Sequence, residues 1–210
     1  MRIEIWSDYV CPFCTVGTRH LNLALDDFEG QEDVDIVWRS FQLDPDAPKD
    51  ASGTALAYLT DVKGLSEQQV VAMNDGLAAR AAEVGLTFNW RESRMVNTLD
   101  AHRLGILARE EGVGVEWDEA VKHAYFTEGR SIADHDELRA LAAAAGLDDG
   151  DVDSVLADES AYLDQVQADV DLARRLGVQG VPFFVFDGKL AVSGAQPVEV
   201  FAQALEQAAN

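Results

Sequence analysis

The feature that most constrains the fold is a change of hydrophobic period along the chain. Residues 3–6 alternate as a half-buried strand does, and residues 34–41 are rich in β-branched and aromatic side chains. Between these strands, the residues from Cys11 to about Phe28 place apolar side chains at helical spacing. The first unit is therefore predicted to be a strand, a helix and a second strand.

Residues 52–177 carry a helical pattern almost throughout. Ser66 and Gln69 fit a capping box, Asp134 fits a looser cap, and glycines stand where several helices should stop. The predicted helices are 66–85, 97–111, 117–127, 134–145 and 159–176. This block reads as one helical insertion.

The last part of the chain returns to the strand period. Residues 181–186 and 189–193 are two strands joined by Asp187-Gly188, a pair typical of tight hairpins, and a final helix follows Pro197. The order is β-α-β, helices, then β-β-α. We therefore predict an α/β fold in which 1–51 and 178–210 share one small mixed sheet and 52–177 is an all-helical insertion.

Length and charge limit the possible partners. A chain of 210 residues with 48% hydrophobic residues is long enough for one domain with an inserted subdomain. With 38 acidic and 16 basic residues the net charge is -22, which argues against nucleic acid and anionic membranes. Such acidity suits high salt, where the Debye length falls to about 3 Å, so we expect a halophilic source. Without a signal peptide or a long apolar run, the expected compartment is the cytoplasm.

The residues that carry chemistry are Cys11 and Cys14, which directly follow the first strand. In a reducing compartment such a pair is catalytic or binds metal rather than acting as a structural disulfide. A structural metal site needs four ligands, and neither a second cysteine pair nor clustered histidines exist, so no metal is predicted. A helix start stabilises a thiolate. Cys11 is therefore the predicted attacking sulfur, and Cys14, one turn later, is the resolving thiol.

Neighbouring residues are candidates for substrate contact. Pro12 suits the first helical turn, and Phe13 lines the predicted entrance, as Trp6, Asp8 and Tyr9 could also do. Before the third strand, Val181-Pro182 could form a cis peptide bond. Its exposed backbone groups would then pair with an extended substrate segment beside Cys11.

Taken together, these segments resemble the DsbA-like thioredoxin-fold oxidoreductases, and among them the FrnE-type cytoplasmic branch. The matching stretches are residues 5–14, 97–104, 177–184 and 192–196. The resemblance implies a thioredoxin fold, Cys11 as nucleophile, Cys14 as resolver and Pro182 as a cis-proline facing them. It also implies a thiol–disulfide oxidoreductase or isomerase that acts on proteins or small thiols. Phe13 stands where the branch usually has tryptophan.

The same resemblance leaves some roles open. Asn97 and His102 are predicted to border the substrate cleft, but Asn97 could equally be a helix cap and His102 a packing residue. A sister branch, the 2-hydroxychromene-2-carboxylate isomerases and kappa-class glutathione transferases, usually has serine in place of Cys11. Glutathione therefore stays open as a thiol co-substrate, and no other cofactor is predicted. A redox-inert binding module is a third alternative, and neither the direction of electron flow nor the oligomeric state is fixed.

Overall fold

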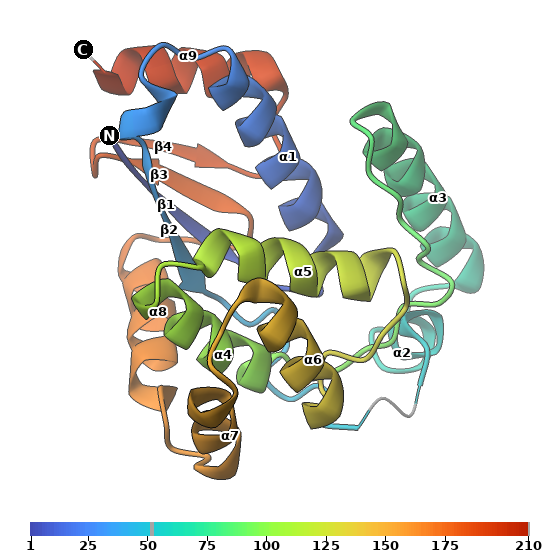
Figure 1. The fold of residues 1–210 in the computed structure, drawn as a ribbon. Helices are drawn as coiled ribbons and strands as arrows, with labels where there is room; N and C mark the ends of the chain where they lie inside the picture. The colour runs from blue at the N-terminus through green and yellow to red at the C-terminus, as the bar shows by residue number, and fades with distance from the viewer. Residues whose placement is uncertain (51–52, 210) are drawn as a thin grey trace.

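The computed structural model describes residues 1–50 and 53–209. In this part of the chain the strands form one four-stranded sheet, ordered β2-β1-β3-β4 (Figure 1). Their bounds are β1 (Arg2–Ser7), β2 (Asp35–Ser40), β3 (Phe183–Phe186) and β4 (Leu190–Ser193). β1 is parallel to β2 and antiparallel to β3, so Ile5 pairs with Trp38 on one side and Phe184 on the other. The two ends of the chain thus share one mixed sheet, as predicted.

Two helices lie side by side on one face of the sheet (Figure 1), namely α1 (Pro12–Asp26) and α9 (Val198–Ala209). Alternate strand residues point to the same face, which places Ile3, Ile5 and Phe184 beneath these helices. Leu21 from α1 and Phe201 from α9 complete this core, and all five side chains are inaccessible to solvent. Burying each one contributes about 1.5–3 kcal/mol, so this core fixes α1 on the sheet.

The opposite face of the sheet contacts α8 (Leu163–Arg175). Trp6 points to this side, where its indole nitrogen donates a 2.9 Å hydrogen bond to the carbonyl oxygen of Asp169. Its ring packs with Ala173 and meets Phe183 edge to face at 6.3 Å. The sheet is therefore a middle layer between α1 and α9 on one face and α8 on the other.

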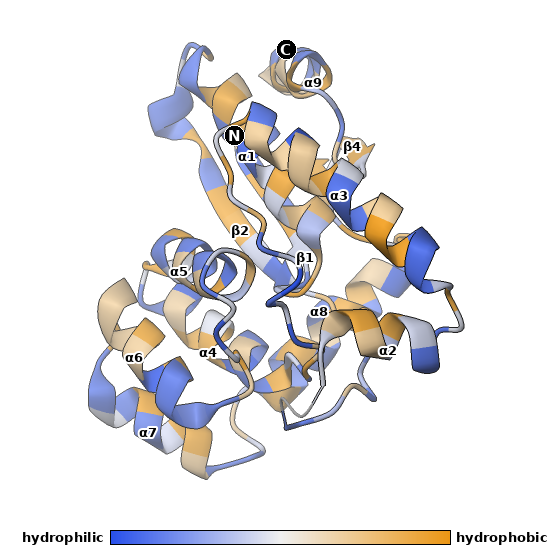
Figure 2. Ribbon diagram, turned by 90° about the vertical axis from the view of Figure 1, so that its right-hand side faces the viewer, coloured by the Kyte–Doolittle hydropathy of each residue, from blue (hydrophilic) through white to orange (hydrophobic). Residues whose placement is uncertain are grey.

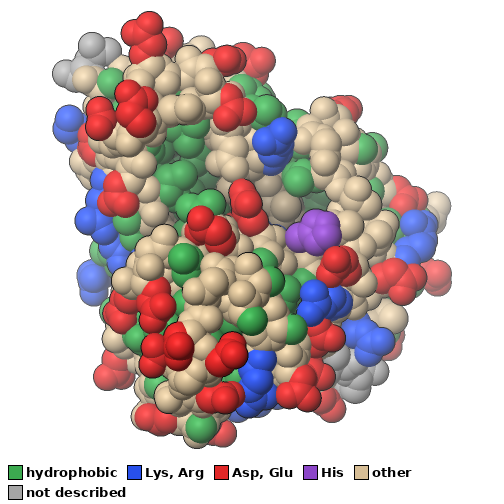
Figure 3. Space-filling view, in the orientation of Figure 1, with side chains coloured by type: hydrophobic (Ala, Val, Ile, Leu, Met, Phe, Trp, Pro, Cys, Tyr) green, Lys and Arg blue, Asp and Glu red, His purple; other side chains and the backbone are tan. Residues whose placement is uncertain are grey.

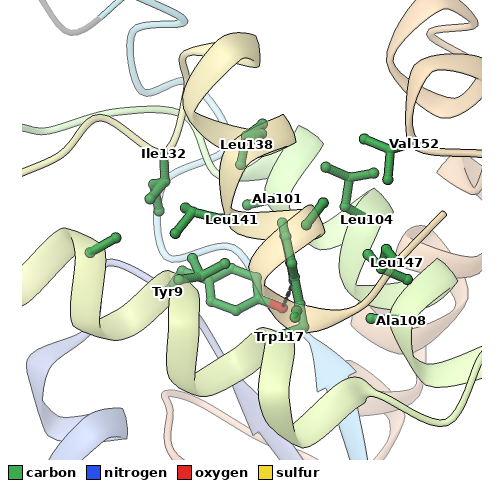
Figure 4. Close-up of a cluster of buried hydrophobic side chains, with 14 of the residues drawn as sticks. Tyr9, Ala101, Leu104, Ala108, Trp117, Ile132, Leu138, Leu141, Leu147 and Val152 are labelled. Atoms are coloured by element: carbon green, nitrogen blue, oxygen red, sulfur yellow. Dashed lines mark hydrogen bonds between the residues drawn. The ribbon is translucent and has the colours of Figure 1, made fainter. Parts of the chain in front are cut away.

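The segment between β2 and β3 is helical, as predicted. Its helices are α2 (Ala55–Asp61), α3 (Glu67–Glu83), α4 (Leu99–Glu110), α5 (Gly114–Phe126), α6 (His135–Ala145), α7 (Asp149–Ala157) and α8. A second core forms among α4 to α7, and Figure 4 shows Leu104, Trp117, Leu138 and Leu141 converging there. Ser66 and Gln69 form the predicted capping box of α3. This second core also receives Tyr9 from the loop after β1 (Figure 4).

The structure corrects several predicted elements. Helices α2 and α7 were not predicted, since α2 is short and buries no residue, while α7 contains Gly150 and several acidic residues. Helix α8 begins at Leu163 rather than at 159, because Tyr162 has a left-handed backbone with φ of 60°. The predicted domain boundary between 51 and 52 lies outside the described residues, so that division stays a prediction.

Polar and apolar residues are mixed along the helices in Figure 2, as expected for helices that bury one side. Acidic side chains are spread over much of the face in Figure 3. Among the described residues, no helix combines the length and the apolar character needed to cross a membrane.

Candidate active site

The two cysteines lie at the start of α1. Cys11 is the N-cap with an extended backbone (φ −91°, ψ 107°), and Pro12 occupies the first helical turn. The amide of Cys11 donates to the carbonyl of Asp8 at 3.1 Å, and the amide of Cys14 donates to the carbonyl of Cys11 at 3.0 Å. None of the described side chains caps this helix end. The free amides and the positive end of the helix dipole are therefore available to a thiolate at Cys11.

The environments of the two thiols differ. A hydrogen bond from the Cys14 thiol lowers the pKa of Cys11, against the opposing effect of burial and of the nearby Asp8 charge. Burial raises the pKa of Cys14 well above its ordinary value, and Lys122 offsets only part of that. Cys14 is inaccessible to solvent, and Cys11 retains 4% exposure. Cys11 is thus the more acidic and more accessible thiol.

A loop before β3 faces Cys11. The Val181–Pro182 peptide bond is cis, and the Cys11 sulfur in its thiol form donates to the carbonyl oxygen of Val181 at 3.6 Å. Residues 177–183, with Ser193 and Gly194, line a surface groove of about 350 Å³. The structure therefore brings the backbone of Val181 to Cys11, and substrate contact by Val181 and Pro182 stays a prediction.

Gly17 allows this close packing, and its role could not be recognised from sequence beyond the presence of a glycine inside a helix. A Cβ atom at Gly17 would lie 2.9 Å from Cγ of Pro182 and 3.3 Å from Phe184. Real Cβ atoms essentially never come as close to another heavy atom as this Cβ would come to Pro182. The glycine therefore lets the loop with Pro182 rest directly on α1, one turn after the cysteines.

The dipeptide between the cysteines has one exposed and one partly buried member. Phe13 is 36% exposed, and the guanidinium of Arg80 from α3 lies 5.6 Å from its ring centre. Pro12 is half-buried and forms part of the wall of a neighbouring cleft. Both residues are placed where a substrate bound at Cys11 would meet them, although the contact itself stays a prediction.

Three residues predicted near the entrance are instead buried. Trp6 and Asp8 are inaccessible to solvent, and Tyr9 is 6% exposed. Asp8 accepts a 2.8 Å hydrogen bond from the amide of Leu43, and the Tyr9 hydroxyl accepts one from Trp117 at 3.0 Å. The idea that these side chains line the entrance is wrong, because their partners hold them inside; they support the site from beneath.

Asn97 and His102 make contacts that fit their alternative roles. The Asn97 side chain donates to the carbonyl of Pro45 at 2.8 Å and accepts from the amide of Leu99 at 2.9 Å, at the start of α4. His102 is 4% exposed, lies 3.3 Å from a carboxylate oxygen of Asp8 and packs against the Tyr9 ring. These bonds favour a capping and a packing role, and substrate contact stays a prediction for both.

A buried ion pair lies below α1, and sequence analysis missed it. Nζ of Lys122 is 2.7 Å from the carboxylate of Asp118 on the preceding turn of α5, and both side chains are almost fully buried. Lys122 also lies over the ring of Trp38 at 4.4 Å. Burial raises the pKa of Asp118. The Asp-x-x-x-Lys spacing was visible, but it is far more common on an exposed helix face.

The described residues contain no group of three or more His, Cys, Asp or Glu side chains that could hold a metal ion. Both cysteines are free thiols. The site is thus a dithiol at a helix start, facing a cis-proline loop.

Comparison with known proteins agrees with this geometry. The model of the DSBA-like thioredoxin domain matches residues 2–206. A probable DsbA oxidoreductase from Streptomyces coelicolor is 46% identical, with a TM-score of 0.94 over 99% of this chain and 89% of that chain. The protein YwbO from Bacillus subtilis is 28% identical over 98% of this chain and 96% of its own length.

The cytosolic disulfide reductase DsbM from Pseudomonas aeruginosa shares the fold, with a TM-score of 0.63 at 19% identity over 99% of this chain and 98% of that chain. Sequence, fold and the placement of the cysteines agree with one another. This chain therefore belongs to the DSBA-like thioredoxin domain family of thiol–disulfide oxidoreductases.

Proposed function

We propose that the protein catalyses thiol–disulfide exchange through a mixed disulfide at Cys11 that is resolved by Cys14. One observation carries the proposal. Cys11 is the N-cap of α1 and has a lowered pKa, whereas Cys14 is buried with a raised pKa. The thiolate is the nucleophile, so the first attack falls to Cys11.

The reductive direction runs in two steps. The Cys11 thiolate attacks one sulfur of a substrate disulfide, and the other substrate sulfur leaves as a thiolate. Cys14 then loses its proton and attacks the Cys11 sulfur, which releases the second substrate thiol and leaves a Cys11–Cys14 disulfide. Two electrons pass to the substrate. The oxidative direction is the reverse, and release of the mixed disulfide by a second substrate thiol would give isomerisation.

Burial of Cys14 orders these steps. Its raised pKa keeps it protonated while Cys11 is free, so it does not compete for the incoming disulfide. Its position one helical turn from Cys11 keeps it within reach of the mixed disulfide.

We propose that the substrate is a thiol or disulfide in an extended peptide or a small molecule. The groove along residues 177–183 exposes backbone groups next to Val181, and an extended segment can pair with them. Phe13 and Pro12 would supply apolar contact beside the reacting sulfur. In this proposal a substrate sulfur would lie between α1 and the cis-proline loop.

Glutathione is the small thiol to test first, because DsbM, a neighbour with the same fold, has been solved with glutathione. A glutathione-activating isomerase or transferase needs no resolving thiol. The presence of Cys14 beneath Cys11 favours dithiol chemistry over that alternative and over a redox-inert binding role.

The test is alkylation mass spectrometry in graded thiol–disulfide buffers, with the wild type, Cys11→Ala and Cys14→Ala. The sequence contains two cysteines, so each variant has a single thiol and gives an unambiguous readout. The wild type should show a two-electron transition, Cys14→Ala should accumulate a mixed disulfide with substrate, and Cys11→Ala should form none. The proposal would be overturned if Cys11 were alkylated slowly and never formed a disulfide with Cys14.

We also propose that the protein is a cytoplasmic member of the FrnE-type branch from a halophile. The net charge of -22 supports the halophilic part, because self-repulsion is screened at high salt. The melting temperature should therefore rise between dilute buffer and molar KCl. A melting temperature that stays constant or falls over that range would contradict it.

A further inference from the structure

A second cavity lies next to the active site, between α1, α3 and α5. Its volume is about 340 Å³, within the range of small-molecule sites. Figure 3 shows the hollow on this face of the molecule. Pro12 forms part of its wall, so the cavity begins at the dipeptide between the two cysteines. It is separate from the groove beside Val181, which other residues line.

The cavity has an apolar body. Its lining includes Val16 from α1, Leu77 and Ala81 from α3, Leu86 after α3 and Phe126 from α5. Val16, Leu77 and Ala81 belong to one small buried cluster, and Leu86 packs against it. An apolar group placed here would extend an existing core and leave water.

Arg19 gives the cavity a cationic group without an acidic partner. Its Nε donates to the carbonyl of Val84 at 3.1 Å, and it forms no ion pair with the described residues. The acids of the same cavity are Asp118, which Lys122 neutralises, and Glu119, which is exposed. The guanidinium thus remains available to a carboxylate, which it binds well.

Two threonines add polar groups on the α1 wall. Thr15 and Thr18 line the cavity, and their buried hydroxyl oxygens have no hydrogen-bond partner in the described part of the chain. Thr18 is 8% exposed. A helical threonine populates two χ1 rotamers, and rotation can turn a hydroxyl toward the cavity. Both residues lie within one turn of Arg19, so hydroxyl donors and the guanidinium are on the same wall.

We propose that this cavity binds a small molecule with a carboxylate on an apolar body. The apolar part fills the space between α1 and α3, and the carboxylate meets Arg19 with help from the threonine hydroxyls. The ligand covers Pro12 without touching either sulfur, so it is not the disulfide substrate. Its binding is independent of the redox chemistry.

The test is isothermal titration calorimetry with 4-phenylbutyrate and its uncharged analogue 4-phenylbutanamide at ~0.15 M salt, where surface charges are screened beyond about 8 Å. The wild type should bind the acid saturably and at least tenfold more tightly than the amide. Arg19→Gln should remove that preference, and Leu86→Trp should weaken both ligands by filling the cavity. Arg175→Gln removes an exposed arginine on α8 and should change nothing.

Circular dichroism confirms the folding of each variant. The proposal is overturned if the acid shows no saturable binding up to about ten millimolar, a generous limit for a ligand of this size. It is also overturned if acid and amide bind equally or if Arg19→Gln keeps the preference. Because heat is measured and not activity, a failure of the disulfide chemistry would leave this result unaffected.

Discussion

The core between the sheet and helices α1 and α9 is built from aliphatic and aromatic side chains such as Ile5, Leu21 and Phe201. The helical segment instead buries charged side chains as well as apolar ones, namely Arg103, Asp118, Lys122 and Asp169. Arg103 donates to Asp100 and to the carbonyls of Val155, Asp158 and Ala161, which ties α4 to α7 and the loop after it. The sheet half thus sets the position of the cysteines, and the helical half brings charge beneath them.

The largest expected effect comes from breaking the buried ion pair of the helical half. Asp118→Leu should lower the free energy of unfolding by about 3–5 kcal/mol, because Lys122 would remain buried without its counter-ion. The double variant Asp118→Leu with Lys122→Met should recover most of that loss, since an apolar pair can replace a buried ion pair. Urea denaturation measures both. Equal losses in the single and double variants would show that the pair does not act as a unit.

The next largest effect is expected from a substitution that disrupts the packing of the sheet half at the active site. Gly17→Ala should lower the free energy of unfolding by about 1–3 kcal/mol, because the new methyl group would overlap Pro182. Gly76→Ala is the matched control, since Gly76 also lies inside a helix but faces open space. Gly76→Ala should raise the free energy of unfolding by up to about 1 kcal/mol, because alanine has a higher helix propensity than glycine. Thermal melts would contradict the close approach of Pro182 if both substitutions changed stability in the same direction.

The smallest expected effect concerns pH. Because the pKa of Cys11 is lowered chiefly by the Cys14 thiol, the pH midpoint of Cys11 alkylation should lie below that of an ordinary cysteine. It should rise toward the ordinary value in Cys14→Ala. Iodoacetamide rates against pH measure this, and an unchanged midpoint would assign the lowered pKa to the helix start alone.

The same shifts affect the stability of the reduced protein in opposite ways. The lowered pKa of Cys11 stabilises the fold above the ordinary thiol pKa, and this contribution is lost as the pH falls through the lowered value. The raised pKa of Cys14 stabilises the fold below the ordinary value, and this contribution is lost as the pH rises. Alkaline unfolding of reduced protein should therefore be milder in Cys14→Ala than in the wild type.

The parts of the molecule that sequence predicted well are those fixed by local pattern. The alternation of apolar and polar residues predicted β1, and the Asp187-Gly188 turn predicted the hairpin. Both features depend on only a few neighbouring residues. The cysteine pair followed from its position after a strand. What could not be predicted depends on packing between distant segments. Nothing local distinguishes the buried Asp118 and Lys122 from an exposed pair, or shows that Gly17 touches Pro182.

The register of β1 has a consequence for how the chain acquires its fold during synthesis. Ile5 pairs with Trp38, which is made soon after it, but also with Phe184, which is made much later. Contacts so far apart in sequence carry a large loop-closure cost and form late. The loop that covers Cys11 precedes β3, so the nascent chain carries Cys11 without this cover until that loop has been made. Thiol-modifying agents should therefore reach these cysteines most easily on the ribosome.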